Sequence, residues 1–143
     1  MSVCTFFGHS ECHGLDMAVL RAAIENLIKQ GADTFLVGNQ GQFDGMVLSC
    51  LRSLWQQYGH IRYSVVLAYM PAGEKNGADM ENTLYPEIEG HPRFAIERRN
   101  RYLIDNADMV LCYVDHTWGG AYKFAKMARS RGLTVVNIGK IPV

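Results

Sequence analysis

The hydrophobic positions of the chain follow two alternating patterns. Short runs rich in β-branched and aromatic residues are typical of strands, and they cover residues 3–7, 33–37, 61–69, 109–114 and 134–138. Between them, apolar residues recur at three- and four-residue spacing, which predicts amphipathic helices over residues 16–31, 46–58, 94–106 and 122–131. We expect Asp16 to cap the first helix and Gly31 to end it.

This alternation predicts a single α/β domain over residues 1–143, without an internal repeat. Strands joined by helices form a parallel sheet with right-handed crossovers. We therefore expect a doubly wound, Rossmann-like fold: a five-stranded, mainly parallel sheet in the order 3-2-1-4-5, with helices on both faces. In this class, ligands bind beyond the carboxyl ends of the strands, where the strand order reverses. The sequence thus predicts a ligand-binding crevice at that edge.

Three turns are expected to meet at the crevice. Residues 8–10 follow the first strand, residues 38–45 contain three glycines and precede a helix, and residues 117–122 contain two more glycines before the last helix. A glycine turn at a helix start exposes backbone N–H groups, which suits a phosphate or a carboxylate. The pattern is neither GxGxxG nor a Walker A loop, so tight turns without a ligand are the alternative interpretation.

Several side chains near these turns are candidates for ligand contacts. Asp44 can cap a helix or accept hydrogen bonds from a ribose hydroxyl, and Lys123 is either a phosphate ligand or a solvated lysine. Successive helical residues point about 100° apart, so only one or two of the arginines in 98–101 can face the crevice. Tyr63, Tyr69 and Trp118 offer rings for stacking on a base, although strand aromatics more often belong to the core. The predicted ligand-binding residues are Gly8, His9, Ser10, Gly38, Asn39, Gln40, Gly41, Phe43, Asp44, Pro71, Arg99, Asn100, Trp118, Gly119, Gly120, Tyr122 and Lys123.

Neither a metal site nor a catalytic residue is predicted. His9, Glu11, Cys12 and His13 are residue types that ligate zinc, but they fall within one loop and no second ligand pair is evident. A polar turn with one histidine facing the ligand is the preferred interpretation. There is no GxSxG motif, and no cysteine has an evident histidine partner. No cofactor is predicted.

Composition excludes several other classes of protein. Fourteen Lys and Arg residues balance fourteen Asp and Glu residues, so no overall field favours nucleic acid or an anionic membrane. No segment approaches the ~20 apolar residues of a membrane span, and the first residues do not resemble a signal peptide. The four scattered cysteines form no CxxC pair. We expect a reduced, cytoplasmic protein, with residues 70–92 as a long functional or mobile loop.

The motifs at the expected crevice resemble those of the SLOG superfamily, and most closely its compact DUF1273 or YpsA-like proteins. The resemblance rests on Gly8-His9 after the first strand, Gly-x-x-Gly-x-Phe-Asp at residues 38–44, Arg99-Asn100-x-Tyr102 followed by Asp108, and Gly119-Gly120. It covers nearly the whole chain, with the motifs in the right order and spacing. It implies a Rossmann-like fold that binds nucleotides or nucleotide-derived ligands, often as a homodimer.

The same superfamily includes the LOG enzymes, which hydrolyse the N-glycosidic bond of nucleoside monophosphates. Their pattern pairs an arginine with Gly-Gly-x-Gly-Thr-x-x-Glu, and here Arg99 matches the arginine and Gly119-Gly120 the first two glycines. The chain then departs, because Tyr122, Lys123 and Lys126 replace the glycine, threonine and glutamate. A lysine cannot support the developing oxocarbenium charge as that glutamate does. The resemblance therefore favours binding over hydrolysis by that route.

Three functions follow from these observations. The preferred one is a sensor or sequestering protein in which residues 38–41, Gly119-Gly120 and Arg99 hold phosphate, Asp44 lies near the sugar, and His9 or Tyr122 lies near the base. The alternative is a hydrolase of the phosphoribohydrolase type that uses another acid, such as Glu11, Asp44 or Asp115. The third is a partner-binding subunit without a small ligand.

Overall fold

The computed structural model describes residues 2–69, 82–86 and 90–143. Its centre is a sheet of six parallel strands in the order β4-β3-β2-β1-β5-β6. The strands are β1 (Val3–Gly8), β2 (Thr34–Val37), β3 (Arg62–Val66), β4 (Thr83–Leu84), β5 (Met109–Tyr113) and β6 (Thr134–Asn137). The helices are α1 (Met17–Lys29), α2 (Gly41–Gln57), α4 (Ala95–Asp105) and α5 (Gly120–Ser130), with a short 3-10 helix, η1 (Pro92–Phe94), before α4.

The predicted fold and strand order are confirmed, with one addition. The five expected strands are β1, β2, β3, β5 and β6, and they pair in the expected order. The sixth strand, β4, pairs with β3 at the edge of the sheet through Val65↔Thr83 and Val66↔Leu84. It has two residues, which is too short to leave a hydrophobic pattern in the sequence.

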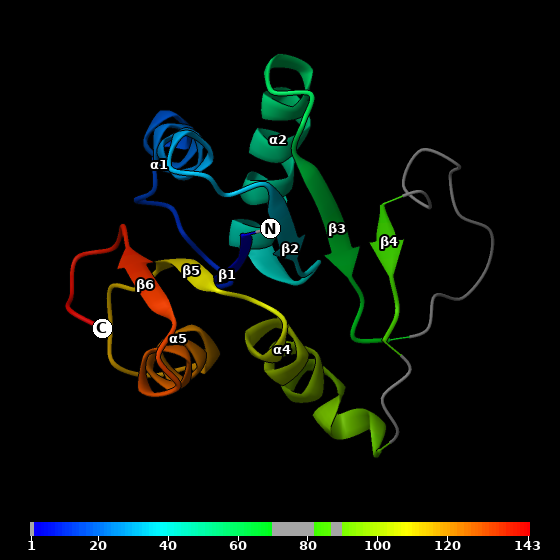
Figure 1. The fold of residues 1–143 in the computed structure, drawn as a ribbon. Coiled ribbons are helices and arrows are strands. Elements are labelled where there is room, and N and C mark those ends of the chain that lie inside the picture. The colour runs from blue at the N-terminus through cyan, green and yellow to red at the C-terminus, as the bar shows by residue number, and fades with distance from the viewer. Residues whose placement is uncertain (1, 70–81, 87–89) are drawn as a thin grey trace.

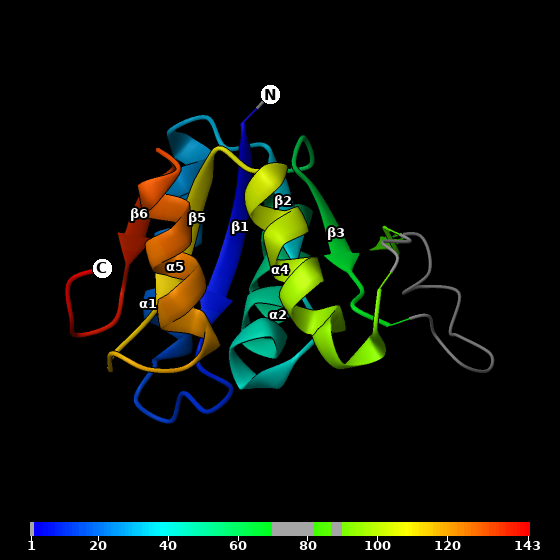
Figure 2. The same ribbon diagram turned by 90° about the horizontal axis from the view of Figure 1, so that it is seen from below.

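Two pairs of helices cover the two faces of the sheet. Figure 1 shows α1 and α2 on one side and α4 and α5 on the other, and Figure 2 shows α4 and α5 in front of the strands. β1 contributes side chains to the hydrophobic layers on both faces of the sheet, because successive strand residues point to opposite faces. Phe6 packs on Phe35 beneath α1 and α2, whereas Phe7 packs on Phe124 of α5. The sheet is thus buried on both faces.

The ends of α1 follow the sequence signals. The Asp16 side chain accepts a hydrogen bond from Ala18 N–H, as expected of an N-cap, and Gly31 has a φ of 111° just beyond the helix. By contrast, α2 begins at Gly41, five residues before the expected Met46. None of the helices in the described ranges combines the length and apolar character needed to cross a lipid bilayer.

Candidate functional site

A cavity of about 850 Å³ opens at the carboxyl ends of the central strands. β1 lies between β2 and β5 in the sheet. The strands that follow β1 in sequence are added first on the β2 side, and the later strands β5 and β6 are added on the opposite side. The cavity is therefore at the reversal of strand order, as predicted. In Figure 2 the segments after β1 and β5 and the start of α2 converge at this end of the sheet. The predicted residues that line the cavity are Gly8, His9, Ser10, Gly38, Gln40, Gly41, Asp44, Arg99, Asn100, Trp118, Gly119 and Gly120.

Gly8 places the first turn directly against the start of α2. A Cβ atom at this position would overlap the ring of Phe43. Phe43 is 1% exposed and lies in the core cluster between the sheet and α1 and α2, so its predicted ligand contact is replaced by a packing role. The turn is further fixed by the hydrogen bond from Gln42 N–H to Ser10 O, at 2.8 Å. The first two rim segments are therefore joined by packing and by backbone bonding.

A buried arginine and a buried carboxyl group meet at Gly38. Arg99 is 4% exposed and Asp44 is 8% exposed. Arg99 Nη1 donates to Val66 O at 3.2 Å, and its Nε donates to Asn100 Oδ1 at 2.8 Å. A Cβ atom on residue 38 would lie 2.8 Å from Asp44 Oδ2 and would overlap the guanidinium group. The glycine therefore makes room for this pair.

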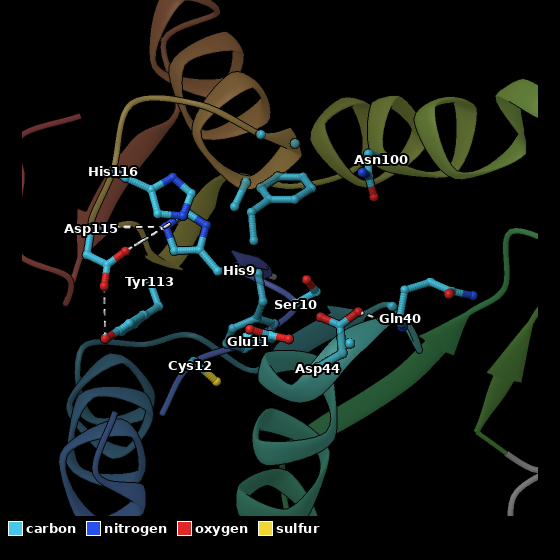
Figure 3. Close-up of a pocket in the computed structure, with 18 of the residues that line it drawn as sticks. His9, Ser10, Glu11, Cys12, Gln40, Asp44, Asn100, Tyr113, Asp115 and His116 are labelled. Carbon is cyan, nitrogen blue, oxygen red and sulfur yellow. Dashed lines mark hydrogen bonds and ion pairs between the residues drawn. The ribbon is translucent and has the colours of Figure 1, made fainter. Parts of the chain in front are cut away.

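Asp44 is both a hydrogen-bond acceptor at the start of α2 and a titratable group of the cavity. Its Oδ2 accepts the backbone N–H of Gln40 at 2.9 Å, which satisfies a donor at the start of α2 (Figure 3). Burial raises the pKa of Asp44 from 3.8 to about 6, although the Gln40 hydrogen bond and the Arg99 charge both lower it. The pKa of Arg99 is lowered, chiefly by burial, with Asp44 and Tyr69 acting in the opposite direction. The cavity therefore holds a carboxyl group that titrates near neutral pH.

Opposite this pair, three rings form a stack that begins inside the protein and ends in solvent. His9 follows β1 and is 8% exposed, and its ring centroid lies 3.6 Å from that of His116, with 14° between the ring planes. The ring of His116 in turn lies 3.9 Å from that of Trp118, at 19°. Trp118 is 67% exposed. We call His9, His116 and Trp118 the aromatic stack.

The inner end of the stack is held by Asp115. His9 Nε2 accepts the backbone N–H of Asp115 at 3.0 Å and lies 3.1 Å from its Oδ1 (Figure 3). The ring of Tyr113 meets that of His9 edge-on, with centroids 6.1 Å apart at 89°. Burial and the neighbouring His116 lower the pKa of His9, and Asp115 partly offsets them. A neutral imidazole that accepts a backbone hydrogen bond agrees with this direction.

The same residues are the candidates for holding a metal ion. Ligand atoms of His9, Asp115 and His116 lie within 4.8 Å of one another. Within the described ranges, Glu11, Cys12 and His13 join no such group. Imidazole lone pairs lie in the ring plane, so two stacked rings cannot both point at one ion about 2.0–2.1 Å away without rotating. The stack suits ring packing better than metal binding, and the absence of a metal stays a prediction.

The third turn leaves the start of α5 open to the cavity. Gly119, the residue before the helix, has a φ of 88°, a conformation that favours glycine, and no side chain caps the helix. The first helical bond of α5 runs from Lys123 N–H to Gly119 O, so the N–H groups of residues 120–122 precede it. A Cβ atom on Gly120 would meet nothing within 4 Å. Among the described residues, these three N–H groups have no hydrogen-bond partner, and the position of Gly120 leaves space beside them.

Of the other predicted residues that the structure describes, Asn39, Tyr122 and Lys123 do not line the cavity. Asn39 is exposed, and Tyr122 packs against the cluster beneath α4 and α5. Lys123 Nζ donates to Glu97 Oε1 at 2.7 Å and so links α5 to α4. Pro71 lies outside the described residues.

The arginines of α4 divide as their helical spacing predicts. Arg99 alone of the three reaches the cavity, since Arg98 donates to His91 O and Arg101 donates to Glu97 Oε1 at 3.3 Å. The lining residues that the sequence argument missed include His116, Tyr113, Ile96 and Lys140. His116 had a sequence signal, because it directly precedes the third turn. Lys140 had a weaker one, its place after the last strand.

Comparisons with known proteins add no relative to this description. No protein-family model matches the chain, and no curated protein matches it either.

Proposed function

We propose that this protein binds a nucleotide or a nucleotide-derived small molecule in the cavity, as a sensor or a sequestering protein. The observation that carries the proposal is the convergence of a buried arginine, Arg99, and an uncapped helix start, at Gly120, on one cavity of about 850 Å³. Both are groups that bind phosphate in proteins. The volume lies within the range of small-molecule sites.

The parts of such a ligand have complementary groups in the cavity. The first-turn N–H groups of α5 and the guanidinium of Arg99 suit phosphate oxygens. Asp44 suits a ribose hydroxyl, since one of its oxygens already accepts Gln40 N–H and a carboxylate can accept further hydrogen bonds. The resemblance to SLOG proteins, which we retain as part of the proposal, points to the same class of ligand.

The test compares alanine substitutions at two exposed helical glycines, Gly120 and Gly45. Gly120 lines the cavity and Gly45 does not, and neither would bring a new Cβ atom within 4 Å of another group. Neither has a positive φ, so alanine fits both backbones and removes up to about 1 kcal/mol of glycine's helix penalty. Both variants should therefore fold at least as stably as the wild type. In Gly120→Ala the new methyl group should occupy the space beside the free N–H groups.

Calorimetric titration with AMP, GMP, UMP, ADP and ADP-ribose gives the readout. We expect at least one of these to bind the wild type and Gly45→Ala equally, and to bind Gly120→Ala about tenfold or more weakly, a loss of about 1.4 kcal/mol. Equal affinity for all three proteins would contradict a phosphate at α5. Failure of the whole panel to bind or to raise the melting temperature would contradict the proposed function and favour a partner-binding subunit.

A second candidate function is nucleotide hydrolysis, and one observation favours it. Asp44 lines the cavity with a pKa raised to about 6, which suits a general acid near neutral pH. The glutamate used by LOG enzymes is replaced by Lys126, so any such reaction needs a different acid. Release of free base from the same nucleotides, followed by chromatography and abolished in Asp44→Asn, would establish hydrolysis. Binding without release would support the binding protein.

We also propose the homodimer that the resemblance implies. Light scattering at several protein concentrations measures the mass directly, and a mass of 16.0 kDa at all of them would contradict it.

A further inference from the structure

We propose that the exposed face of Trp118 binds the base of a purine nucleotide, which adds a fourth ring to the aromatic stack of His9, His116 and Trp118. The inference rests on the proposed function and names the chemical class of its ligand. Trp118 lines the cavity and is 67% exposed, although one face of its ring is covered by His116. A large exposed face on the wall of a cavity is a stacking surface without a partner.

The stack holds this surface in a fixed orientation before a ligand arrives. His9 accepts a hydrogen bond from the backbone N–H of Asp115 and is 8% exposed, and the ring planes of the stack are 14° apart from His9 to His116 and 19° apart from His116 to Trp118. His116 Nδ1 has no hydrogen-bond partner among the described atoms and its Nε2 lies 3.9 Å from Asp115 Oδ1, while its ring stacks on both His9 and Trp118. A ring that is already ordered loses little conformational entropy on binding, which favours affinity.

The surroundings of Trp118 favour a nucleotide over an apolar partner. The cavity that Trp118 lines also carries polar and charged residues, among them Ser10, Glu11 and Asp115. The lining thus combines the indole and other apolar side chains, such as Ile96, with polar and charged groups, as a nucleotide with a flat base and a polar sugar-phosphate requires. The next two residues are Gly119, the N-cap of α5, and Gly120, its first residue, so the proposed phosphate-binding donors and the stacking face are adjacent in the chain. One nucleotide can engage both.

The indole favours a purine over a pyrimidine. Stacking is sequence-tolerant because every base has a π-face, but a two-ring base covers more of a two-ring indole. The structure thus assigns two contributions to one ligand: a base on Trp118, and a phosphate at α5 and Arg99. Removing the indole should strongly weaken the binding of purine nucleotides. It should leave the binding of the same ligand without its base almost unchanged.

The chain offers a direct optical test, because its two tryptophans are Trp118 and Trp55. Trp55 lies on α2, 48% exposed, and does not line the cavity. In Trp55→Phe all indole fluorescence comes from Trp118, and a base stacked on that ring should quench it. We expect AMP to quench this emission with saturation and ribose 5-phosphate to bind without comparable quenching.

Calorimetry on Trp118→Ala completes the test, with Trp55→Ala as the matched exposed-tryptophan control. Trp118→Ala should bind AMP about tenfold or more weakly, but ribose 5-phosphate within about twofold of the wild type. Trp118→Tyr should restore part of the AMP affinity. Circular dichroism should show unchanged folding, because the ring is exposed.

The outcomes separate this inference from the function on which it rests. If the wild type binds AMP and Trp118→Ala binds it equally well, the stacking surface is refuted and the proposed function stands. If UMP binds as tightly as AMP and loses as much affinity in Trp118→Ala, the purine preference is refuted. If AMP, GMP and ribose 5-phosphate all fail to bind the wild type, the inference is refuted. The proposed function fails with it only if UMP, ADP and ADP-ribose also fail to bind.

Discussion

Asp44 makes the stability of the protein depend on pH in an unusual direction. Its pKa is about 6 in the folded protein, against 3.8 ordinarily, so the folded state binds this proton more tightly than the unfolded chain. Between pH 3.8 and about 6, the folded state therefore holds more protons at this position. The contribution of Asp44 to the free energy of unfolding therefore falls as pH rises through that window, and the loss is complete well above pH 6. Most structural carboxylates behave in the opposite way.

The size of the loss follows from the same values. A difference of about two pH units corresponds to about 3 kcal/mol at 1.36 kcal/mol per unit. Asp44→Asn removes the charge, and its amide oxygen can still accept Gln40 N–H. We expect the unfolding free energy of the wild type to fall by about 2 kcal/mol more than that of Asp44→Asn between pH 4 and pH 8, because pH 4 already lies just above the unfolded pKa of 3.8. Near pH 8 the variant should be the more stable protein.

Urea denaturation at several pH values, followed by circular dichroism, measures this difference directly. Comparing the change with pH between the two proteins cancels the contributions of all other titrating groups. Asp105→Asn, which removes an exposed carboxylate instead, controls for the change in net charge. Parallel pH profiles for the wild type and Asp44→Asn would refute the assignment of a raised pKa to Asp44.

Three further substitutions test the packing, hydrogen bonds and ion pair around the site. Gly8→Ala should lower the unfolding free energy by about 1–3 kcal/mol in urea denaturation, because its methyl group overlaps Phe43. Adding Phe43→Leu should recover part of the loss. An unchanged unfolding free energy in Gly8→Ala would contradict this packing. Asn137→Ala should cost about 2–4 kcal/mol in the same assay, because the Asn137 side chain bonds to Val114 N and O, Gly139 N and Ile141 O; a loss below about 1 kcal/mol would contradict it. Lys123→Ala should leave nucleotide affinity within about twofold in calorimetry, because its amine pairs with Glu97 outside the cavity; a tenfold loss would place the amine on the phosphate.

The fold could be predicted from the sequence because its central strands, β1, β2 and β5, are buried on both faces and its helices on one. Strands and helices therefore differ in the spacing of their hydrophobic residues along the sequence. The alternation of these two spacings restricts the topology to a few arrangements. The start of α2 was predicted too late, because its first turn carries polar Gln42 and Asp44 around a single apolar residue, Phe43. β4 leaves no period at all.

The site could be located from the sequence, but the roles within it could not. Topology alone brings the ends of β1, β2 and β5 together, so the three turns were identified. The functions of Gly8 and Gly38, however, depend on partners 35 and 61 positions away, Phe43 and Arg99, which packing selects. Likewise, nothing local in the sequence indicates that His9, His116 and Trp118 stack. Long-range packing, not residue type, assigns these roles.

The charges on the cavity wall limit which anions can enter. The described lining residues carry three carboxyl groups, on Glu11, Asp44 and Asp115, against two basic side chains, on Arg99 and Lys140. With Asp44 ionised, the wall is therefore formally negative by one charge, and protonation of Asp44 makes it neutral. Each further phosphate on a ligand adds repulsion that two cations cannot offset. Protonation of Asp44 therefore removes one repulsive charge, so a bound anion should favour the protonated form of this side chain and raise its pKa further.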